Sequence, residues 1–391
     1  MNILKHVKVM FGGEIVQEPK TVPLFYPSVG RNAIKYVTEV LESKWLAEGP
    51  KTAEFEDKLN QWFGQAYTVL TNSGTNALHI AYQLAGIQEG DDVLTPVLTC
   101  VATNTPLLTL RANPIFVDID PKTLTIDPED IKRKLTPKTK AIIVVHFGGI
   151  PCAMDEINAI AQERGIPVIE DAAQAMGAYY KGQKIGNSNN ITIFSLQAIK
   201  NLTTGDGGIL RLPNEKYYEI AKRMKWFGID RTARRGEWEG SAPPREINND
   251  IKEVGYKYNM NDIASAIGLA GLEELDIWLI TRACIALRYN EAFKKVSGIT
   301  LLQPSYYYQS SYWLYQILVE RRVDFVRMMQ SKGIEVSLSH VRNDSYSVFK
   351  KQKFEVPNMD KIESQYICLP INPHLSGEDV SRVIDAVKGG W

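Results

Sequence analysis

Short runs rich in valine and isoleucine alternate with longer amphipathic segments from about residue 66 to residue 210. The runs include DDVLTPVLT, NPIFVDID, KAIIVVHFGG, IPVIEDAA and NITIFSLQ, and helical patterns such as MDEINAIAQERG lie between them. Near-continuous apolar strands that alternate with helices are typical of a mostly parallel sheet covered on both faces. The sequence therefore predicts an α/β domain, and DGGILRLP is one more candidate strand in it.

The pattern changes after about residue 212, and a chain of 391 residues is too long for one minimal domain. We expect an N-terminal arm over 1–50, a large α/β domain over 51–275 and a smaller C-terminal α+β domain over 276–391. Residues 260–296 carry the pattern of one long amphipathic helix. Near the C-terminus, Ser376 is expected to cap a helix that has Asp379 at its third position.

Composition excludes several classes of protein. Lysine plus arginine equals aspartate plus glutamate, so the basic stripe of a nucleic-acid binder is not expected. No stretch is apolar over the length that spans a bilayer, and the N-terminus lacks the apolar core of a signal peptide. The four cysteines form no CxxC pair, which indicates reduced thiols in a cytoplasmic protein.

The segment TNSGTNALHI predicts a phosphate site. A strand that ends in Ser73-Gly74-Thr75 and opens directly into a helix presents hydroxyls and backbone N–H groups at a positive helix end. The segment lacks the glycine spacing of nucleoside-triphosphate and dinucleotide loops, which favours one small phosphate. The alternative interpretation is an ordinary helix cap.

The segment VIEDAAQAMGA places the adjacent acids Glu170 and Asp171 at the end of an apolar strand. A carboxylate in that position is partly desolvated and normally has a partner. A protonated ring nitrogen is one such partner, because the carboxylate raises the pKa of the ring. The alternative is that Asp171 caps a helix over the residues that follow.

Lys200 lies where a strand gives way to a glycine-rich loop, SLQAIKNLTTGDGG. Lysine forms Schiff bases with carbonyl compounds when it is held near other cations or away from water. The alternative is one more exposed lysine. A later segment, GYKYNMNDIASAIG, predicts an aromatic turn before a helix, with no evident partner among the strand-end residues of its own chain.

The order of these pieces resembles the DegT/DnrJ/EryC1/StrS aminotransferases. The resemblance runs from VPLFYPSVGRNAIKYVTEVLESKWLAEGPKTAEFEDKL to CLPINPHLSGEDVSRVIDAV, and EDAAQAMGAYYKGQKIG with FSLQAIKNLTTGDGG is its most specific part. It implies the fold of type I pyridoxal 5'-phosphate (PLP) enzymes, an α/β fold with a mostly parallel seven-stranded sheet and a smaller C-terminal α+β domain. It also implies transfer of an amino group from L-glutamate to a nucleotide-linked keto sugar.

The resemblance implies roles for individual residues. Lys200 matches the lysine that forms the imine with PLP, and its presence counts against the dehydratases of the family, which have histidine there. Asp171 matches the partner of the pyridine nitrogen, and Gln174 the residue near the phenolic oxygen. Ser195 and the backbone at 74–75 match the phosphate contacts. Cys100 stands where relatives commonly carry an aromatic residue beside the ring.

The same resemblance implies a homodimer with shared active sites, in which Lys257 or Asn259 of the GYKYNM turn meets the phosphate of the neighbouring subunit. His340 and Arg342 are candidates for substrate contacts, with Arg342 bound to an anionic group of the donor or the nucleotide; a surface loop is the alternative. Two other functions stay open: a cyclitol-ketone aminotransferase and, opposed by the Lys200 and Asp171 pair, a regulatory relative without activity.

Overall fold

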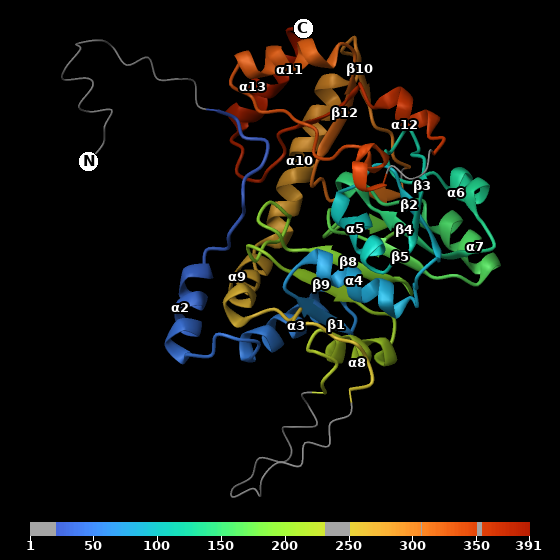
Figure 1. Cartoon of the computed structure of the whole chain (residues 1–391). Coiled ribbons are helices and arrows are strands. Elements are labelled where there is room, and N and C mark those ends of the chain that lie inside the picture. Colours follow the sequence, from blue (N-terminus) through green and yellow to red (C-terminus); the bar gives the residue numbers. More distant parts are fainter. Residues whose placement is uncertain (1–20, 231–250, 306, 350–353) are drawn as a thin grey trace, which may run out of the picture.

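The central sheet of the computed structural model has seven strands in the order β1-β9-β8-β5-β4-β2-β3 (Figure 1). The model describes residues 21–230, 251–305, 307–349 and 354–391, so the first twenty residues of the expected arm lie outside it. The strands are β1 (Thr68–Thr71), β2 (Asp92–Pro96), β3 (Asn113–Val117), β4 (Thr139–Val145), β5 (Val168–Asp171), β8 (Ile191–Ser195) and β9 (Gly208–Arg211).

Pairing in this sheet is parallel from β8 through β5, β4 and β2 to β3. Strand β9 pairs antiparallel with both β1 and β8, so it alone among the seven runs in the opposite direction. The prediction of a mostly parallel sheet is confirmed, and so is the strand expected in DGGILRLP.

Helices cover both faces of the sheet, because successive side chains of a strand point to opposite faces. On β4, Ile142 belongs to one apolar cluster and Ile143 to another; on β1, Leu70 and Val69 divide in the same way. The helices up to the end of the sheet are α2 (Ala33–Ser43), α3 (Pro50–Phe63), α4 (Gly74–Leu84), α5 (Val101–Thr109), α6 (Pro128–Lys134), α7 (Met154–Arg164) and α8 (Glu215–Met224).

Two helices, α9 (Asp262–Leu272) and α10 (Leu275–Phe293), occupy the stretch that predicts one long helix. The prediction of a single helix is wrong, because the helix is interrupted at Glu273 and Glu274. Both carboxylates bind the N-terminal segment: Glu274 accepts the backbone N–H of Arg31 at 2.7 Å, and Glu273 accepts the hydroxyl of Tyr36 at 2.6 Å. Helix α2 consequently packs on α9.

The C-terminal part contains an antiparallel sheet in the order β10-β12-β13. Its buried cluster combines Ile317 and Leu369 from the sheet with Phe325 and Val383 from helices, and Val22 of the N-terminal segment joins it. The elements are β10 (Ile299–Leu301), β12 (Tyr315–Val319), α11 (Arg322–Ser331), α12 (Pro357–Ile362), β13 (Tyr366–Leu369) and α13 (Gly377–Lys388). The domain boundaries expected from the sequence stay a prediction.

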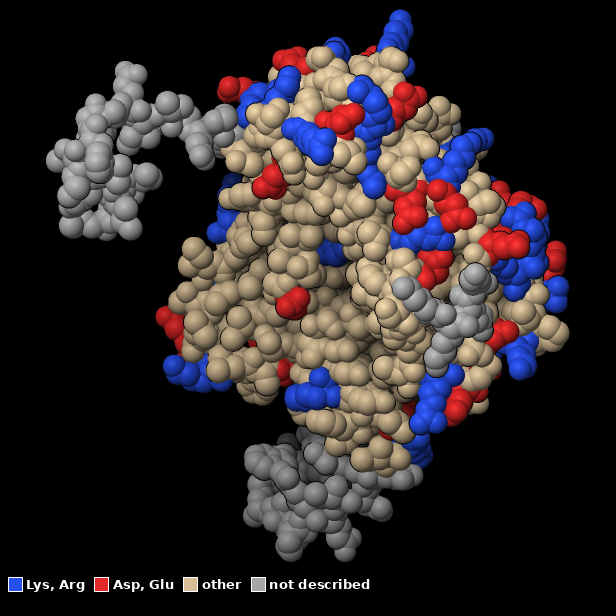
Figure 2. All heavy atoms as spheres, turned by 45° about the horizontal axis from the view of Figure 1, so that its top comes forward, with Lys and Arg blue, Asp and Glu red and all other residues tan. Residues whose placement is uncertain are grey.

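Helix α13 begins with a capping box in which Ser376 accepts the backbone N–H of Asp379 at 3.1 Å, as predicted. A small third sheet joins β11 (Tyr308–Gln309), β6 (Tyr179–Tyr180) and β7 (Gln183–Lys184). None of the helices in the described part of the chain has both the length and the apolar character that crossing a membrane requires. Figure 2 shows a face where basic and acidic side chains are interspersed around a hollow of mostly uncharged residues.

Candidate active site

A cavity of about 340 Å³ lies at the carboxyl ends of the parallel strands. Strand β5 ends at Asp171 and strand β8 at Ser195, and both residues line it. The carboxyl edge of such a sheet is where ligands of α/β proteins bind. The residues predicted from the sequence that line the cavity are Ser73, Gly74, Thr75, Cys100, Asp171, Gln174, Ser195, Lys200 and His340.

The Asp171 carboxylate is buried, with only 3% of the residue exposed. The Thr103 hydroxyl donates to Oδ2 at 2.7 Å, and the backbone N–H of Ala173 donates to Oδ1 at 3.1 Å. Burial raises the pKa of Asp171, and these two hydrogen bonds together with the charge of Lys200 oppose the rise. Residues 172–178 form turns, so the interpretation of Asp171 as a helix cap is wrong.

Lys200 lies in the turn after β8, with its backbone N–H donated to the Gln197 carbonyl at 2.9 Å. The residue is partly buried, and Nζ lies 3.6 Å from the centroid of the Trp313 ring. Loss of hydration lowers the pKa of Lys200 to about 8, although Cys100 and Asp171 favour the charged form. The interpretation of Lys200 as an ordinary exposed lysine is therefore wrong.

The N-terminus of α4 forms another wall of the cavity. The Ser73 hydroxyl caps the helix by accepting the backbone N–H of Asn76 at 3.1 Å, as the cap interpretation held. Glycines let this turn approach its neighbours: a Cβ at Gly74 would lie 3.0 Å from the Cβ of Ser195, and one at Gly208 would lie 2.5 Å from the Ser73 carbonyl oxygen. The same helix end thus serves as a cap and as a positively polarised wall.

Aromatic residues that the sequence did not single out form the opposite wall. Trp313 is 2% exposed, and its Nε1–H donates to the Ile199 carbonyl at 2.9 Å. Its ring is stacked with Phe25 at 5.8 Å between centroids and with His340 at 6.1 Å. These residues come from three distant segments, so sequence spacing gave no signal for their meeting.

His340 is held among aromatic rings. Its imidazole lies 6.0 Å from the Phe147 ring, and Nε2 is buried with no hydrogen-bond partner within the described residues. Burial, and secondarily the charge of Lys200, lowers the pKa of His340 to about 3. The imidazole is therefore neutral near pH 7.

Arg342 does not line the cavity. Its guanidinium donates to both oxygens of Asp344, at 2.7 and 2.6 Å, and also binds Asp360 and Glu363. Asp360 in α12 and Glu363 at its end hold the segment that carries His340 against that helix. An anion-binding role for Arg342 stays a prediction, since in this arrangement the side chain is committed to acids of its own chain.

The aromatic turn at 255–260 also lies outside the lining of the cavity. The Lys257 ammonium lies 3.4 Å from the centroid of the Trp226 ring and donates to Asn259 Oδ1 at 3.0 Å. The turn does have partners in its own chain, contrary to expectation: Thr71 forms a β-bridge with Asn259, and the Asn72 N–H donates to the Tyr258 carbonyl at 2.7 Å. The turn therefore sits directly beside the start of α4.

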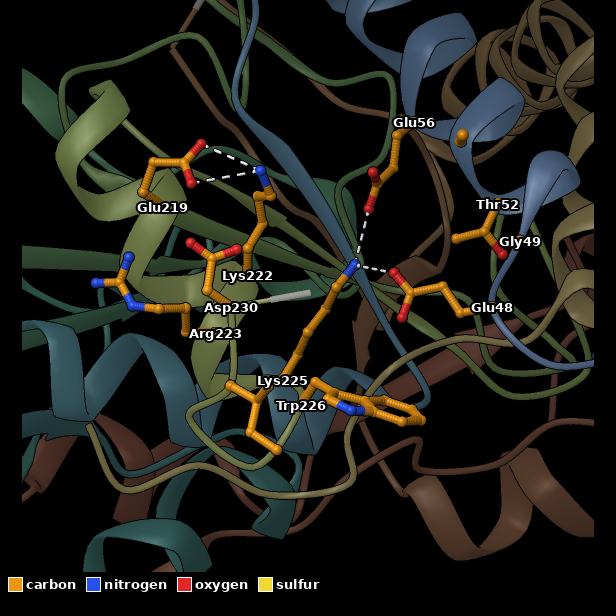
Figure 3. Close-up of a pocket in the computed structure, with 12 residues that line it drawn as sticks. Glu48, Gly49, Thr52, Glu56, Glu219, Lys222, Arg223, Lys225, Trp226 and Asp230 are labelled. Atoms are coloured by element: carbon orange, nitrogen blue, oxygen red, sulfur yellow. Dashed lines mark hydrogen bonds and ion pairs between the residues drawn. The ribbon is translucent and has the colours of Figure 1, made fainter. Parts of the chain in front are cut away.

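A second cavity, between α3 and the C-terminal end of α8, is shown in Figure 3. Lys225 Nζ lies there between the carboxylates of Glu48, at 2.8 Å, and Glu56, at 3.2 Å. The other cations of its wall are paired as well, Lys222 with Glu219 and Arg223 with Glu253. These cations are thus each paired with a carboxylate, whereas Lys200 of the first cavity forms no such ion pair within the described residues.

Comparison with known proteins gives a consistent result. The model of the DegT/DnrJ/EryC1/StrS aminotransferase family matches residues 27–388. The crystal structure of AtS13 from Actinomadura melliaura is 36% identical, with a TM-score of 0.90, and the match covers 96% of this chain and all of that one. The sugar aminotransferase CalS13 from Micromonospora echinospora is 32% identical, with a TM-score of 0.89 and coverage of 95% and 100%. Spr1654 from Streptococcus pneumoniae, in its PLP form, is 28% identical over 94% of this chain and 98% of that one, with a TM-score of 0.86.

Proposed function

The chain belongs to the DegT/DnrJ/EryC1/StrS aminotransferase family and is a sugar aminotransferase, and we propose that it transfers the amino group of L-glutamate to a nucleotide-linked 3- or 4-keto sugar. The observation that carries the proposal is the presence of a partly buried lysine, Lys200, and a buried carboxylate, Asp171, in one cavity beside a helix N-terminus. These are the groups that PLP chemistry needs from a protein.

The cavity fits PLP by the chemistry of its walls. When bound, PLP supplies an electron sink for the carbon that gains or loses the amino group. Lys200 would hold the cofactor covalently, and its amine would be the group that moves the proton at the reacting carbon. Asp171 would keep the pyridine nitrogen protonated, and the Thr103 hydroxyl fixes the orientation of that carboxylate. The start of α4 and the Ser195 hydroxyl would bind the phosphate.

Gln174 would help to orient the cofactor. Its Oε1 accepts the backbone N–H of Gly148 at 2.7 Å, which leaves its amide nitrogen as the end that can donate to the phenolic oxygen. Cys100 lines the cavity beside these groups, and its small side chain leaves room that an aromatic residue would fill. We assign His340 to the sugar, because a neutral imidazole suits a hydroxyl better than a carboxylate.

The proposed function also includes a homodimer. Within the described residues, the lining of the cavity includes no arginine, and Lys200 is its only lysine. We propose a homodimer in which each subunit contributes Lys257 or Asn259 to the phosphate of its partner, so that polar groups from a second chain add to the few in this lining. The position of that turn beside Asn72, at the edge of the site, is compatible with this exchange.

Two measurements test the function. The purified protein, given PLP, should show a visible absorption band that borohydride removes. The reduced cofactor should then be recovered on the peptide that contains Lys200. Incubation with glutamate should then convert a nucleotide keto sugar, but not a cyclitol ketone, into an amine. Failure of the protein to bind PLP covalently at Lys200 would overturn the proposal, and preferential turnover of the cyclitol ketone would replace the sugar by that substrate.

A further inference from the structure

The Lys200 side chain rests against the face of an indole rather than against an acid. Its Nζ lies 3.6 Å from the centroid of the Trp313 ring. Within the described part of the chain, Lys200 makes no ion pair, and no side-chain hydrogen bond of its ammonium is formed. The negatively polarised face of tryptophan is the best aromatic surface for an ammonium ion, and the attraction grows when water is excluded.

The indole cannot move away from this lysine easily. Its Nε1–H is bound to the carbonyl of Ile199, the residue directly before Lys200, so ring and lysine are tied to the same turn. Trp313 is 2% exposed and stacked against Phe25 and His340, which come from two other segments. The ring is therefore a fixed surface for the lysine side chain.

We propose that Trp313 is a positioning residue whose ring holds the Lys200 ammonium whenever that side chain is not bonded to the cofactor. This inference rests on the proposed function, because that function requires Lys200 to be bonded at one stage and free at another. A free lysine in an apolar cavity would otherwise have no fixed position. When the Lys200 ammonium lies against the Trp313 ring, the side chain stays within the site and can bond to the cofactor again.

Four titratable groups share the cavity with Lys200: Asp171 from the end of β5, Cys100 before α5, His340, and Asp206 before β9. Asp171 and Cys100 favour the charged lysine, and His340 is neutral. The Trp313 ring adds to the first two and opposes the effect of burial. Removing the ring should therefore lower the pKa of Lys200 below its value of about 8.

The experiment uses cofactor-free protein and stoichiometric PLP as the probe. The rate of covalent capture, followed by absorbance as pH is varied, depends on the fraction of Lys200 that is unprotonated. Ionisations of PLP are the same for every variant, so differences between variants report the protein. Trp313→Leu should move the inflection down by about one pH unit, and Trp313→Phe by less, because a benzene ring is the weaker surface. Lys200→Ala gives the background from other lysines.

Trp62→Leu is the matched control, because Lys184 Nζ lies 3.5 Å from the centroid of that ring, outside the cavity. Its loss should leave the inflection in place. Unchanged inflections in both Trp313 variants, or upward shifts, would overturn the inference while covalent capture at Lys200 would still support the proposed function. If Trp313→Leu does not fold, the Trp313→Phe shift decides alone: a downward shift supports the role of the ring, and none refutes it. Absence of any capture in the wild type would instead refute the function itself.

Discussion

Two lysines with limited exposure to water, Lys200 and Lys225, have opposite surroundings. Lys225 is 4% exposed between Glu48 and Glu56, whose attraction outweighs burial and raises the pKa of Lys225. Lys200 has an indole face and a more distant carboxylate, and burial lowers the pKa of Lys200 to about 8. The comparison shows that burial alone does not decide what a lysine does. Adjacent acids keep Lys225 positively charged. Lys200 has no acid in contact, so it loses its proton more easily and is available as a nucleophile.

The largest effect is expected from removal of the reactive amine. Lys200→Ala should lower turnover by more than about 10³-fold, about 4 kcal/mol in the barrier, because covalent binding and proton transfer both need that group. The variant should still fold and retain PLP non-covalently, without the band of the wild type. Steady-state turnover and the absorption spectrum measure this. Lys181→Ala, at an exposed lysine paired with Asp155, is the control. Turnover near the wild-type rate would end the assignment of Lys200.

Removal of the paired lysine should affect stability instead. Lys225→Met removes the cation that lies between Glu48 and Glu56, and breaking such a buried group costs about 3 kcal/mol. Urea unfolding measures the loss, and the visible PLP band should persist in the variant. Lys222→Met breaks the more exposed pair with Glu219 and should cost less than about 1 kcal/mol. Equal losses in the two variants would mean that burial of Lys225 matters little.

A smaller loss is expected when the carboxylate of the first cavity becomes an amide. Asp171→Asn keeps the shape and the hydrogen bond from Ala173 but removes the charge that, in the proposed function, keeps the pyridine nitrogen protonated. Turnover should fall by about a hundredfold, near 2.7 kcal/mol, with little change in the substrate concentration at half-saturation. Single-turnover kinetics with glutamate provide the measurement. A nearly silent variant would reduce Asp171 to a residue that orders the turn at 172–178.

The sequence predicted one side of this comparison far better than the other. Strand periodicity placed Asp171 at the carboxyl end of a strand, where ligands of parallel sheets bind, and the family resemblance added Ser195. The partners of Lys225, Glu56 in α3 and Glu48 before it, lie about 170 positions away in the sequence, and no local pattern predicts these contacts. The position of Trp313 in the site was not predicted for the same reason.

The break between α9 and α10 shows a different limit. Its residues fit a continuous helix, and only contacts with the segment at 31–36 explain why the helix ends there. Periodicity predicts elements and the faces that they bury, while pairings across long sequence distances depend on the fold as a whole.

The smallest expected effect concerns whether each of the two lysines raises or lowers the free energy of unfolding. In cofactor-free protein, Lys200→Met should raise the free energy of unfolding at pH 7 by about 1 kcal/mol, because a charged group is no longer held away from water. A folded pKa near 8, below the ordinary lysine value, means that the unfolded chain binds more protons between pH 8 and about 10.5. The stability of the wild type should therefore rise over that window relative to Lys200→Met, and the gap between them should close. The raised pKa of Lys225 stabilises the fold fully below about pH 10.5, so the deficit of Lys225→Met should stay constant up to that pH. Urea unfolding at pH 7 and pH 9.5 measures both variants: the gap for Lys200→Met should narrow between these two pH values, and the deficit of Lys225→Met should not change. A Lys200→Met variant that is less stable than the wild type at pH 7 would show that the Trp313 ring more than offsets the burial of this ammonium.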